Sequence, residues 1–262
     1  MGLLSLGFQH DIQIVVASHK TYWMPNDPMY IPVQVGAQGK EPIRGFFLDN
    51  QGENISSKNP RYCELTALYW AWKNLNAEYI GLSHYRRHFA GEEKRGVLSH
   101  EEASSLLLNN PVIMPSKRHY VIETVEAHYS HTFDGMHIQV VRDTLSEYDP
   151  AMLPSFERHM RKRSGHIWNM CIMRNDVLDE WCSWLFPLLF SIEKAIDFSS
   201  MSPFEQRVMG RLSERLIDPW LEHNKIRYIE NPVVSLEGEN TTKKVRAFLG
   251  AKFFNKKYKE SF

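Results

Sequence analysis

Residues 79–89 read YIGLSHYRRHF, an apolar run that ends abruptly in cationic and titratable side chains. The apolar part predicts a buried strand at 78–82. His84, Arg86, Arg87 and His88 then follow within five positions, and such groups repel one another unless an anion lies among them. Guanidinium binds phosphate oxygens bidentately and stays charged. The stretch therefore predicts a strand edge that carries a phosphate or diphosphate site. The alternative is a surface loop whose charges lie in water.

Strands and helices alternate along the chain on both sides of this stretch. Apolar runs predict strands at 13–17, 30–36, 78–82, 111–115, 166–173 and 226–234, and amphipathic patterns predict helices at 61–74, 145–163, 176–196 and 204–223. Residues 37–60 are rich in Gly, Asn, Asp and Ser and predict a long loop. Because neither a repeat nor a low-complexity linker interrupts this order, we expect a single α/β domain over residues 1–240.

The bulk composition limits the partners and the compartment. Lys plus Arg and Asp plus Glu both number 31, so no global field favours nucleic acid. Cys63, Cys171 and Cys182 lie in apolar surroundings without a CxxC pair, which indicates reduced core thiols rather than a zinc site or a disulfide scaffold. We find neither a signal peptide nor an apolar run of the ~18 residues that a membrane span needs. These features predict a cytoplasmic protein.

The C-terminal tail, residues 241–262, differs from the rest in charge. From 243 to 259 it carries seven basic residues and no acid, interleaved with aromatic and aliphatic side chains. Such a segment binds anionic membrane surfaces. An equally good alternative is a tail that docks on the domain through its aromatic side chains.

Five segments together resemble a known family over nearly the whole chain. They are DNQGENIS at 49–56, NPRYCELTALYWAWKN at 59–74, GLSHYRR at 81–87, RSGHIWNM at 163–170 and FEQRVMGRLSE at 204–214. They resemble the bacterial polysaccharide-biosynthesis family named domain of unknown function forty-four twenty-two. The resemblance implies a single GT-A-like, Rossmann-like nucleotide-sugar transferase domain with a mixed central sheet flanked by helices. Characterised relatives transfer galactofuranose from UDP-galactofuranose with inversion.

The end of the first strand is the expected place for the nucleotide, because open α/β sheets bind ligands at the carboxyl ends of their strands. Lys20 lies there and can also reach the diphosphate. The candidate residues for nucleotide-sugar binding are Ala17, Ser18, His19, Lys20, Asn54, His84, Tyr85, Arg86 and Arg87.

Many GT-A enzymes carry a metal-binding Asp-x-Asp motif after the strand that here ends at Leu82, and this chain has Ser83-His84-Tyr85-Arg86-Arg87 instead. Arg86 and Arg87 can neutralise the charge that develops on a departing UDP. We therefore expect metal-independent transfer and no firm cofactor. Asp49 or a distant acid leaves manganese or magnesium as the less favoured alternative.

Inverting transfer needs a base that takes the proton of the acceptor hydroxyl. The candidates are Glu214, His166, Asp49 and Glu205. His166 fits a hydrogen-bonded core histidine equally well. Glu64 is set aside, because a carboxylate early in a helix complements the helix dipole.

Five residues are candidates for acceptor or sugar contacts. His128 and His131 have His-x-x-His spacing without a convincing third ligand, so a sugar contact is favoured over zinc. Asn169 falls inside a predicted apolar strand, where a buried amide needs partners. Arg207 and Arg211 share one helix side with Glu214, and a surface ion pair is the alternative that the resemblance outweighs.

The leading prediction is an inverting UDP-sugar-dependent transferase that extends a surface polysaccharide, with an undecaprenyl-diphosphate-linked glycan as acceptor at the inner face of the membrane. The alternative is a non-catalytic nucleotide-sugar or glycan-binding module of a polysaccharide synthesis complex. A phosphate-ester hydrolase lacks a credible nucleophile.

Overall fold

The computed structural model describes residues 11–93 and 96–237. Within these ranges, a mixed sheet of nine strands runs in the order β10-β6-β9-β4-β1-β2-β3, and β5 pairs with both β4 and β11. The strands are β1 (Ile12–Ser18), β2 (Tyr30–Gln34), β3 (Phe47–Leu48), β4 (Tyr79–His84), β5 (Arg87–Phe89), β6 (Val112–Pro115), β9 (Cys171–Arg174), β10 (Ile229–Asn231) and β11 (Val233–Ser235). β7 (Arg118–His119) and β8 (Ser164–Gly165) form a separate pair.

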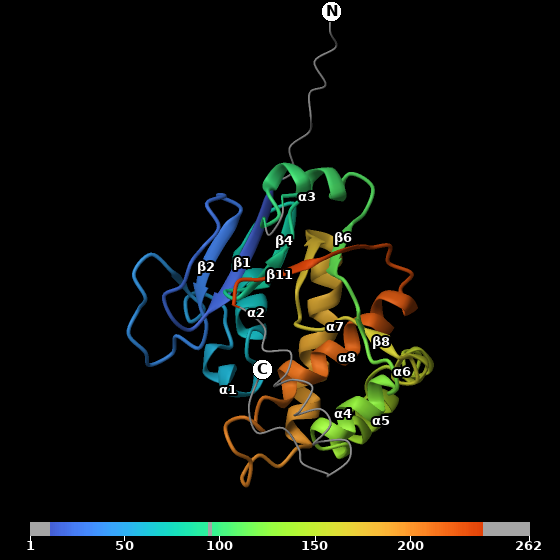
Figure 1. Ribbon diagram of the computed structural model, residues 1–262. Coiled ribbons are helices and arrows are strands. Elements are labelled where there is room, and N and C mark those ends of the chain that lie inside the picture. Colours follow the sequence, from blue (N-terminus) through green and yellow to red (C-terminus); the bar gives the residue numbers. More distant parts are fainter. Residues whose placement is uncertain (1–10, 94–95, 238–262) are drawn as a thin grey trace, which may run out of the picture.

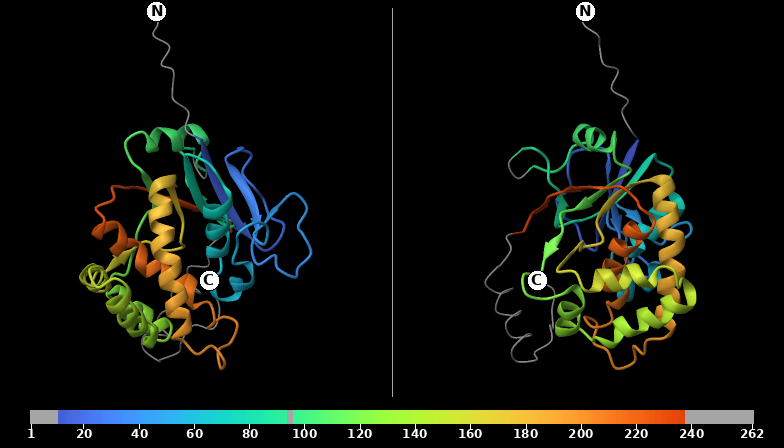
Figure 2. Two further views of the ribbon diagram at one scale, coloured as in Figure 1. Left: turned by 180° about the vertical axis from the view of Figure 1, so that it is seen from behind. Right: turned by 90° about the vertical axis from the view of Figure 1, so that its right-hand side faces the viewer.

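The helices lie in layers around the sheet (Figure 1). They are η1 (Ser56–Lys58), α1 (Asn59–Tyr62), α2 (Leu65–Asn74), α3 (His100–Leu107), α4 (Val125–Thr132), α5 (Met136–Tyr148), α6 (Leu153–Met160), α7 (Asn175–Lys194) and α8 (Val208–His223). α2, α7 and α8 share a core with the sheet residues Ile80 and Leu82. α3 buries Ala103 and Leu107 against the other face. α4, α5 and α6 gather beyond α7 and α8 (Figure 2).

The central strands are apolar on both sides because helices and loops cover both sheet faces. β1 is almost fully buried, as the sequence IQIVVAS predicts for a central strand of an α/β sheet. In β4, a side chain at Gly81 would come within 2.9 Å of the Cys171 carbonyl oxygen on β9. Glycine at this position therefore permits the close pairing of β4 with β9.

The direction of β9 determines which residues meet at one sheet edge. β1, β2, β3 and β4 are parallel, whereas β9 runs antiparallel between β4 and β6. Residues 19–20 and 85–86 follow β1 and β4, and residues 166–170 precede the reversed strand β9. All three segments therefore reach the same edge.

The expected mixed α/β fold is confirmed, while several boundaries differ. The predicted helix 61–74 is split at Cys63, whose φ of 53° no helix accommodates. The predicted helix 145–163 is split before Pro150, since a residue that precedes proline avoids helical geometry. The helix predicted from 204 begins at Val208. The strand predicted at 166–173 begins only at Cys171.

Among the described residues, we find no helix with the length and apolar content needed to cross a bilayer. The tail at 241–262, with its predicted membrane contact, lies outside the described residues.

Candidate active site

Basic side chains gather where β1 and β4 end. The Ser18 hydroxyl donates to the Lys20 carbonyl oxygen at 2.6 Å and turns the chain out of β1. The Tyr85 ring then lies among three groups: the His19 ring at 5.3 Å, the Lys20 ammonium at 5.3 Å and the Arg86 guanidinium at 5.3 Å from its centroid. We call Lys20, Arg86 and Arg87 the cationic cluster. Arg87 is the first residue of β5.

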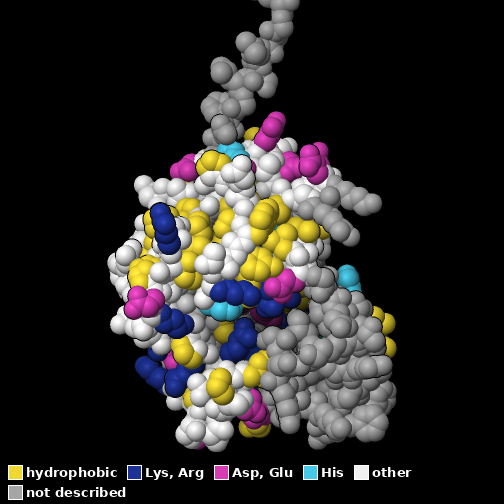
Figure 3. All heavy atoms as spheres, turned by 60° about the vertical axis from the view of Figure 1, so that its left-hand side comes forward, with side chains coloured by type: hydrophobic (Ala, Val, Ile, Leu, Met, Phe, Trp, Pro, Cys, Tyr) yellow, Lys and Arg dark blue, Asp and Glu magenta, His cyan; other side chains and the backbone are white. Residues whose placement is uncertain are grey.

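Positive charges of the cationic cluster act on the neighbouring His19. Burial lowers the pKa of His19, and the positive charges of Lys20, Arg86, Lys40 and Arg207 lower it further. Figure 3 shows Lys and Arg side chains gathered around a histidine on one face, below a broad apolar area. Such a group of positive charges attracts an anion. In the structure, the Glu237 carboxylate lies 3.4 Å from the Arg86 guanidinium.

Two carboxylates lie next to this edge, one directly before α2 and one on α8. Glu64 precedes α2, and its Oε1 accepts a hydrogen bond from the Asn169 amide at 2.6 Å. Glu214 on α8 accepts from the Trp168 backbone N–H at 2.9 Å. The His84 ring nitrogen Nε2 is 2.6 Å from the Trp168 carbonyl oxygen and 4.0 Å from Glu64. Thus the turn at Trp168 and Asn169 joins the Glu64–Glu214 pair to the end of β4.

This turn has an unusual backbone. Trp168 has φ 77° and Asn169 has φ 56°, both in the left-handed region. Asn enters that region readily, whereas a bulky residue such as Trp does so at a cost of roughly 1–3 kcal/mol. The contacts to His84 and Glu214 hold the strained backbone from both sides. Asn169 also donates to the Gly210 carbonyl oxygen at 2.9 Å, which fixes its amide against α8.

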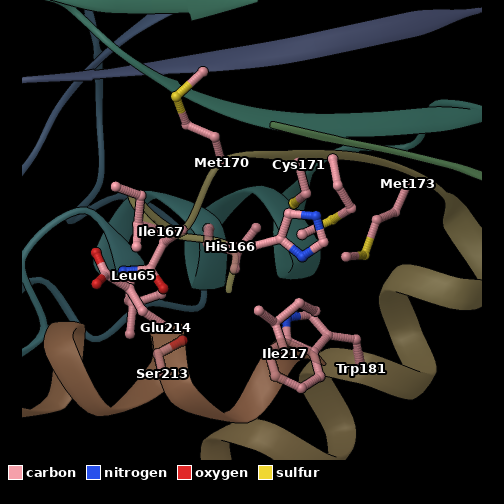
Figure 4. A pocket seen from close by; sticks show the side chains of 13 residues that line it. Leu65, His166, Ile167, Met170, Cys171, Met173, Trp181, Ser213, Glu214 and Ile217 are labelled. Atoms are coloured by element: carbon pink, nitrogen blue, oxygen red, sulfur yellow. The ribbon is translucent and has the colours of Figure 1, made fainter. Parts of the chain in front are cut away.

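The environment of Glu214 suits a proton acceptor. Burial raises the pKa of Glu214, and the negative charge of Glu64 raises it further, while Arg215 at 3.5 Å acts in the opposite direction. A base is most effective when its pKa lies near the working pH. Figure 4 shows a pocket between the segment that carries His166 and Met170 and the α8 side chains Glu214 and Ile217. The volume of this pocket is about 20 Å³. That volume holds roughly one water molecule.

Arg207 and Arg211 surround the start of α8. Arg207 contacts the Cys63 sulfur at 3.1 Å through Nε. Arg211 lies 4.0 Å from the Phe133 ring centroid and 4.3 Å from that of Phe204, and it donates to the Phe204 carbonyl oxygen at 2.6 Å. Burial lowers the pKa of Arg211 to about 10. Arg211 therefore anchors the loop before α8 and is no simple surface ion pair.

The model of the domain of unknown function DUF4422 matches residues 13–225. The chain belongs to the DUF4422 family. Its structure is similar to the apo structure of the bifunctional glycosyltransferase WbbM, with a TM-score of 0.80 and 26% sequence identity over 87% of this chain and 46% of that one. The chain thus spans about half the length of that solved protein. A search of curated proteins finds no match.

In this DUF4422 chain, Asp49 has a full set of hydrogen-bond partners. It is completely buried and accepts from the backbone N–H groups of Gly36 at 2.7 Å and Ala37 at 2.9 Å. The hydroxyls of Thr66, at 2.6 Å, and Ser56 complete its shell. These contacts favour a structural role for Asp49, which holds the loop after β2 against α2.

The sequence pattern predicted His166 at the start of a strand. In the structure it lies in the segment before β9, which begins at Cys171. It is 1% exposed, and its Nδ1 is 2.8 Å from the Asp218 carboxylate, which also accepts from the His166 backbone N–H at 2.8 Å. Burial alone would raise the pKa of Asp218, but the hydrogen bonds and charge of His166 bring it to about 2. The contacts favour the core-histidine alternative for His166.

Glu205 and Asn54 stabilise local turns. The exposed Glu205 accepts from the Ser202 N–H at 2.8 Å and its hydroxyl at 2.6 Å before α8 begins. Asn54 donates to the Gly52 carbonyl oxygen at 2.8 Å. The predicted catalytic role of Glu205 and the predicted nucleotide-sugar contact of Asn54 stay predictions.

The histidines of the His-x-x-His motif meet a carboxylate that the sequence analysis missed. The buried Glu123 lies 3.1 Å from His128 Nδ1 and 2.8 Å from His131 Nδ1. In the part of the chain that the structure describes, no cluster of three or more His, Cys, Asp or Glu side chains could hold a metal ion. The predicted sugar contact of both histidines is untested.

Glu64 and Asp218 are the other site residues that sequence reasoning missed. The sequence pattern placed Glu64 early in a helix at 61–74 and suggested only a dipole effect, whereas in the structure it directly precedes α2. Glu64 lies in the segment 59–74, which resembles the family, and this was the sequence feature that could have indicated a site role. Asp218 lies four residues after Glu214, one helical turn further along α8.

Proposed function

We propose that this protein is a glycosyltransferase that moves a hexose from a UDP-sugar to a glycan. One observation carries the proposal: the cationic cluster and the Glu64–Glu214 pair meet at one sheet edge, joined by the turn at Trp168 and Asn169. Cations suit a diphosphate, and a carboxylate of raised pKa suits an acceptor hydroxyl. The similarity to WbbM supports the same activity.

In this proposal the cationic cluster binds the leaving group. The bond between the anomeric carbon and the diphosphate oxygen breaks, and UDP departs with the electron pair. Arg86, Arg87 and Lys20 stabilise the negative charge that develops. Ala17, Ser18 and His19 at the end of β1 contact the nucleoside, and His84 and Tyr85 complete the wall of the donor site.

Glu214 is the proposed base. It takes the proton of the acceptor hydroxyl while the acceptor oxygen attacks the anomeric carbon from the face opposite UDP, so the configuration inverts. Glu64 orients Asn169 and keeps the pKa of Glu214 raised through its negative charge. In this proposal Glu214 accepts the proton and Glu64 is a positioning residue.

The segment directly after β4 does not fit a divalent cation, since residues 85–88 supply two arginines and a histidine but no carboxylate, the ligand that such a cation prefers. We therefore propose that side-chain cations serve the diphosphate directly. Transfer should persist in EDTA. A rate abolished by the chelator and restored by manganese would contradict this part of the proposal.

The finer identity of the substrates rests on the family resemblance. The proposed donor is UDP-galactofuranose, and the proposed acceptor is a growing surface polysaccharide or an undecaprenyl-diphosphate-linked glycan. The reaction would take place in the cytoplasm at the inner face of the plasma membrane, where the basic residues of 241–262 would contact anionic lipids.

The test is a transfer assay with the full chain, a panel of UDP-sugars that includes UDP-galactofuranose, and a synthetic galactoside acceptor. Released UDP and product mass are measured. Arg86→Ala should lower kcat by about 10²–10³, whereas Arg161→Ala, at an exposed position after α6, should leave it unchanged. No transfer from any donor contradicts the proposal, and UDP binding without turnover favours the non-catalytic module.

A further inference from the structure

A second cavity lies beside the last turns of α8, where Asp218 holds His166. Its volume is about 520 Å³, within the range of cavities that bind small molecules. It is lined by the end of α6, the last turns of α8 and the segment before β10, including His159, Asp218, Glu222 and Tyr228. Asp218 belongs both to this wall and to the hydrogen bonds that hold His166.

His159 leaves hydrogen-bonding capacity unused on this wall. It is 1% exposed, and within the described ranges neither of its ring nitrogens has a hydrogen-bond partner. Burial lowers the pKa of His159 to about 4, so the ring is neutral at physiological pH and offers one donor and one acceptor. Buried polar groups are normally satisfied. A ligand hydroxyl can serve either nitrogen.

Charges of both signs line the cavity, with Lys117, Lys162 and Lys225 beside Asp218 and Glu222. The Lys117 ammonium lies 3.0 Å from Glu230 and donates to the Tyr228 hydroxyl at 2.6 Å. Lys162 pairs with Glu222 at 2.6 Å. An anion would compete with these carboxylates for the ammonium groups, whereas a polyhydroxylated neutral molecule can accept from the lysines and donate to the carboxylates.

An aromatic ring supplies the apolar part of the wall. Tyr228 is partly exposed, and its ring centroid lies 5.3 Å from that of His166 in an edge arrangement. An aromatic face next to balanced donors and acceptors matches a sugar, which has an apolar face and a rim of hydroxyls. Neither the donor site nor the proposed base uses these residues.

We propose that this cavity binds a neutral saccharide unit of the acceptor glycan. That the saccharide belongs to the acceptor rests on the proposed function, while its binding does not depend on transfer. Asp218, in the wall of the cavity, lies one helical turn from Glu214 on the same face of α8. In this proposal the glycan extends from the base along α8 to the cavity.

The experiment measures saturation-transfer NMR of methyl β-galactopyranoside, methyl α-glucopyranoside and lactose with the full chain. Two variants alter the cavity: Tyr228→Leu removes the ring and hydroxyl, and Glu222→Gln removes a charge at an exposed position. Glu180→Gln, exposed on α7, is the matched control. At least one sugar should give a signal that falls at least fivefold in both cavity variants and is unchanged in the control.

UDP binding, measured by calorimetry on the same samples, separates this proposal from the proposed function. A cavity-dependent sugar signal without UDP binding supports the saccharide site and removes the donor site. UDP binding with no sugar signal, or with a signal that neither variant changes, overturns the saccharide site. Inorganic phosphate that displaces the sugar would also overturn it, since the cavity would then be an anion site.

Discussion

Asp49 and Glu214 are both carboxylates beside α2, yet their surroundings differ in kind. Asp49 is fully buried and accepts from backbone N–H groups and hydroxyls on all sides. Glu214 accepts a hydrogen bond of 2.9 Å from the Trp168 N–H and lies 3.5 Å from Arg215, while the negative charge of Glu64 raises its pKa. A carboxylate whose acceptor capacity is filled stabilises a loop. One that is partly exposed and partly satisfied retains capacity for a proton.

Glu214→Gln should produce the largest change. The amide keeps the shape and can still accept from the Trp168 N–H, but it cannot take a proton at neutral pH. We expect kcat to fall by about 10²–10⁴, with UDP affinity unchanged, as measured by the transfer assay and by calorimetry.

Thermal unfolding provides the control for this variant. Glu214 gains no stability from its charge, so the unfolding temperature of Glu214→Gln should equal or exceed that of the unaltered chain. Retained turnover would show that another group is the base, with Glu64 the first to examine.

Asp49→Asn should have the opposite effect. The new amide group cannot accept from all four donors, and buried groups that lose a charged acceptor cost about 3 kcal/mol in unfolding free energy. Urea unfolding should show this loss, while kcat per folded molecule stays within about twofold. A large drop in kcat with unchanged stability would return Asp49 to the list of catalytic candidates.

Asn169→Gly tests the turn that joins Glu64 to α8. Glycine tolerates the φ of 56°, so the variant removes the amide bonds to Glu64 and Gly210 without adding backbone strain. We expect kcat to fall roughly tenfold, which corresponds to about 1.4 kcal/mol. Asn169→Asp places a negative charge against Glu64, so its kcat should be lower still. Equal kcat values for the two variants would contradict a positioning role.

The pH profile should show the smallest effect. Transfer requires the ionised form of Glu214, so kcat falls as the pH drops through its pKa, which burial and Glu64 raise above the ordinary glutamate value. The acid limb should therefore lie above that value. Because the folded state holds this proton more tightly than the unfolded state, the associated stability is present at low pH and is lost as the pH rises through the raised pKa.

The same profile measured on Asp49→Asn gives the comparison. Its acid limb should coincide with that of the unaltered chain, since Asp49 takes no part in proton transfer. An acid limb at the ordinary value in the unaltered chain would remove Glu214 as the base.

The sequence was sufficient to predict several strands of the central sheet. Apolar runs located β1, β4 and β6, because strands covered on both faces need continuous apolar residues. The cluster after β4 was also visible, because charge density is a local property of the sequence.

Long-range geometry could not be predicted in the same way. The sequence pattern predicted a strand at the left-handed turn of Trp168 and Asn169, because most of the surrounding residues are apolar. The contacts that hold the turn come from His84 and Glu214 in distant segments. The contact between Glu64 and Asn169 could not be predicted for a related reason. The two residues lie 105 positions apart in the chain, and their contact also depends on the break at Cys63 that sets where α2 begins.

The helix α8 contributes a residue to each of the two proposed sites, so it couples their positions. Glu214 faces one site and Asp218 the other, one turn apart on a single rigid rod. Insertion of one residue upstream of Glu214 would rotate both side chains by about 100° and uncouple both sites at once, whereas a whole turn would only translate them. Under the two proposals, a shift of α8 would therefore change sugar binding and proton transfer together. Substitutions in the other walls of the cavity could change the glycan preference without moving Glu214.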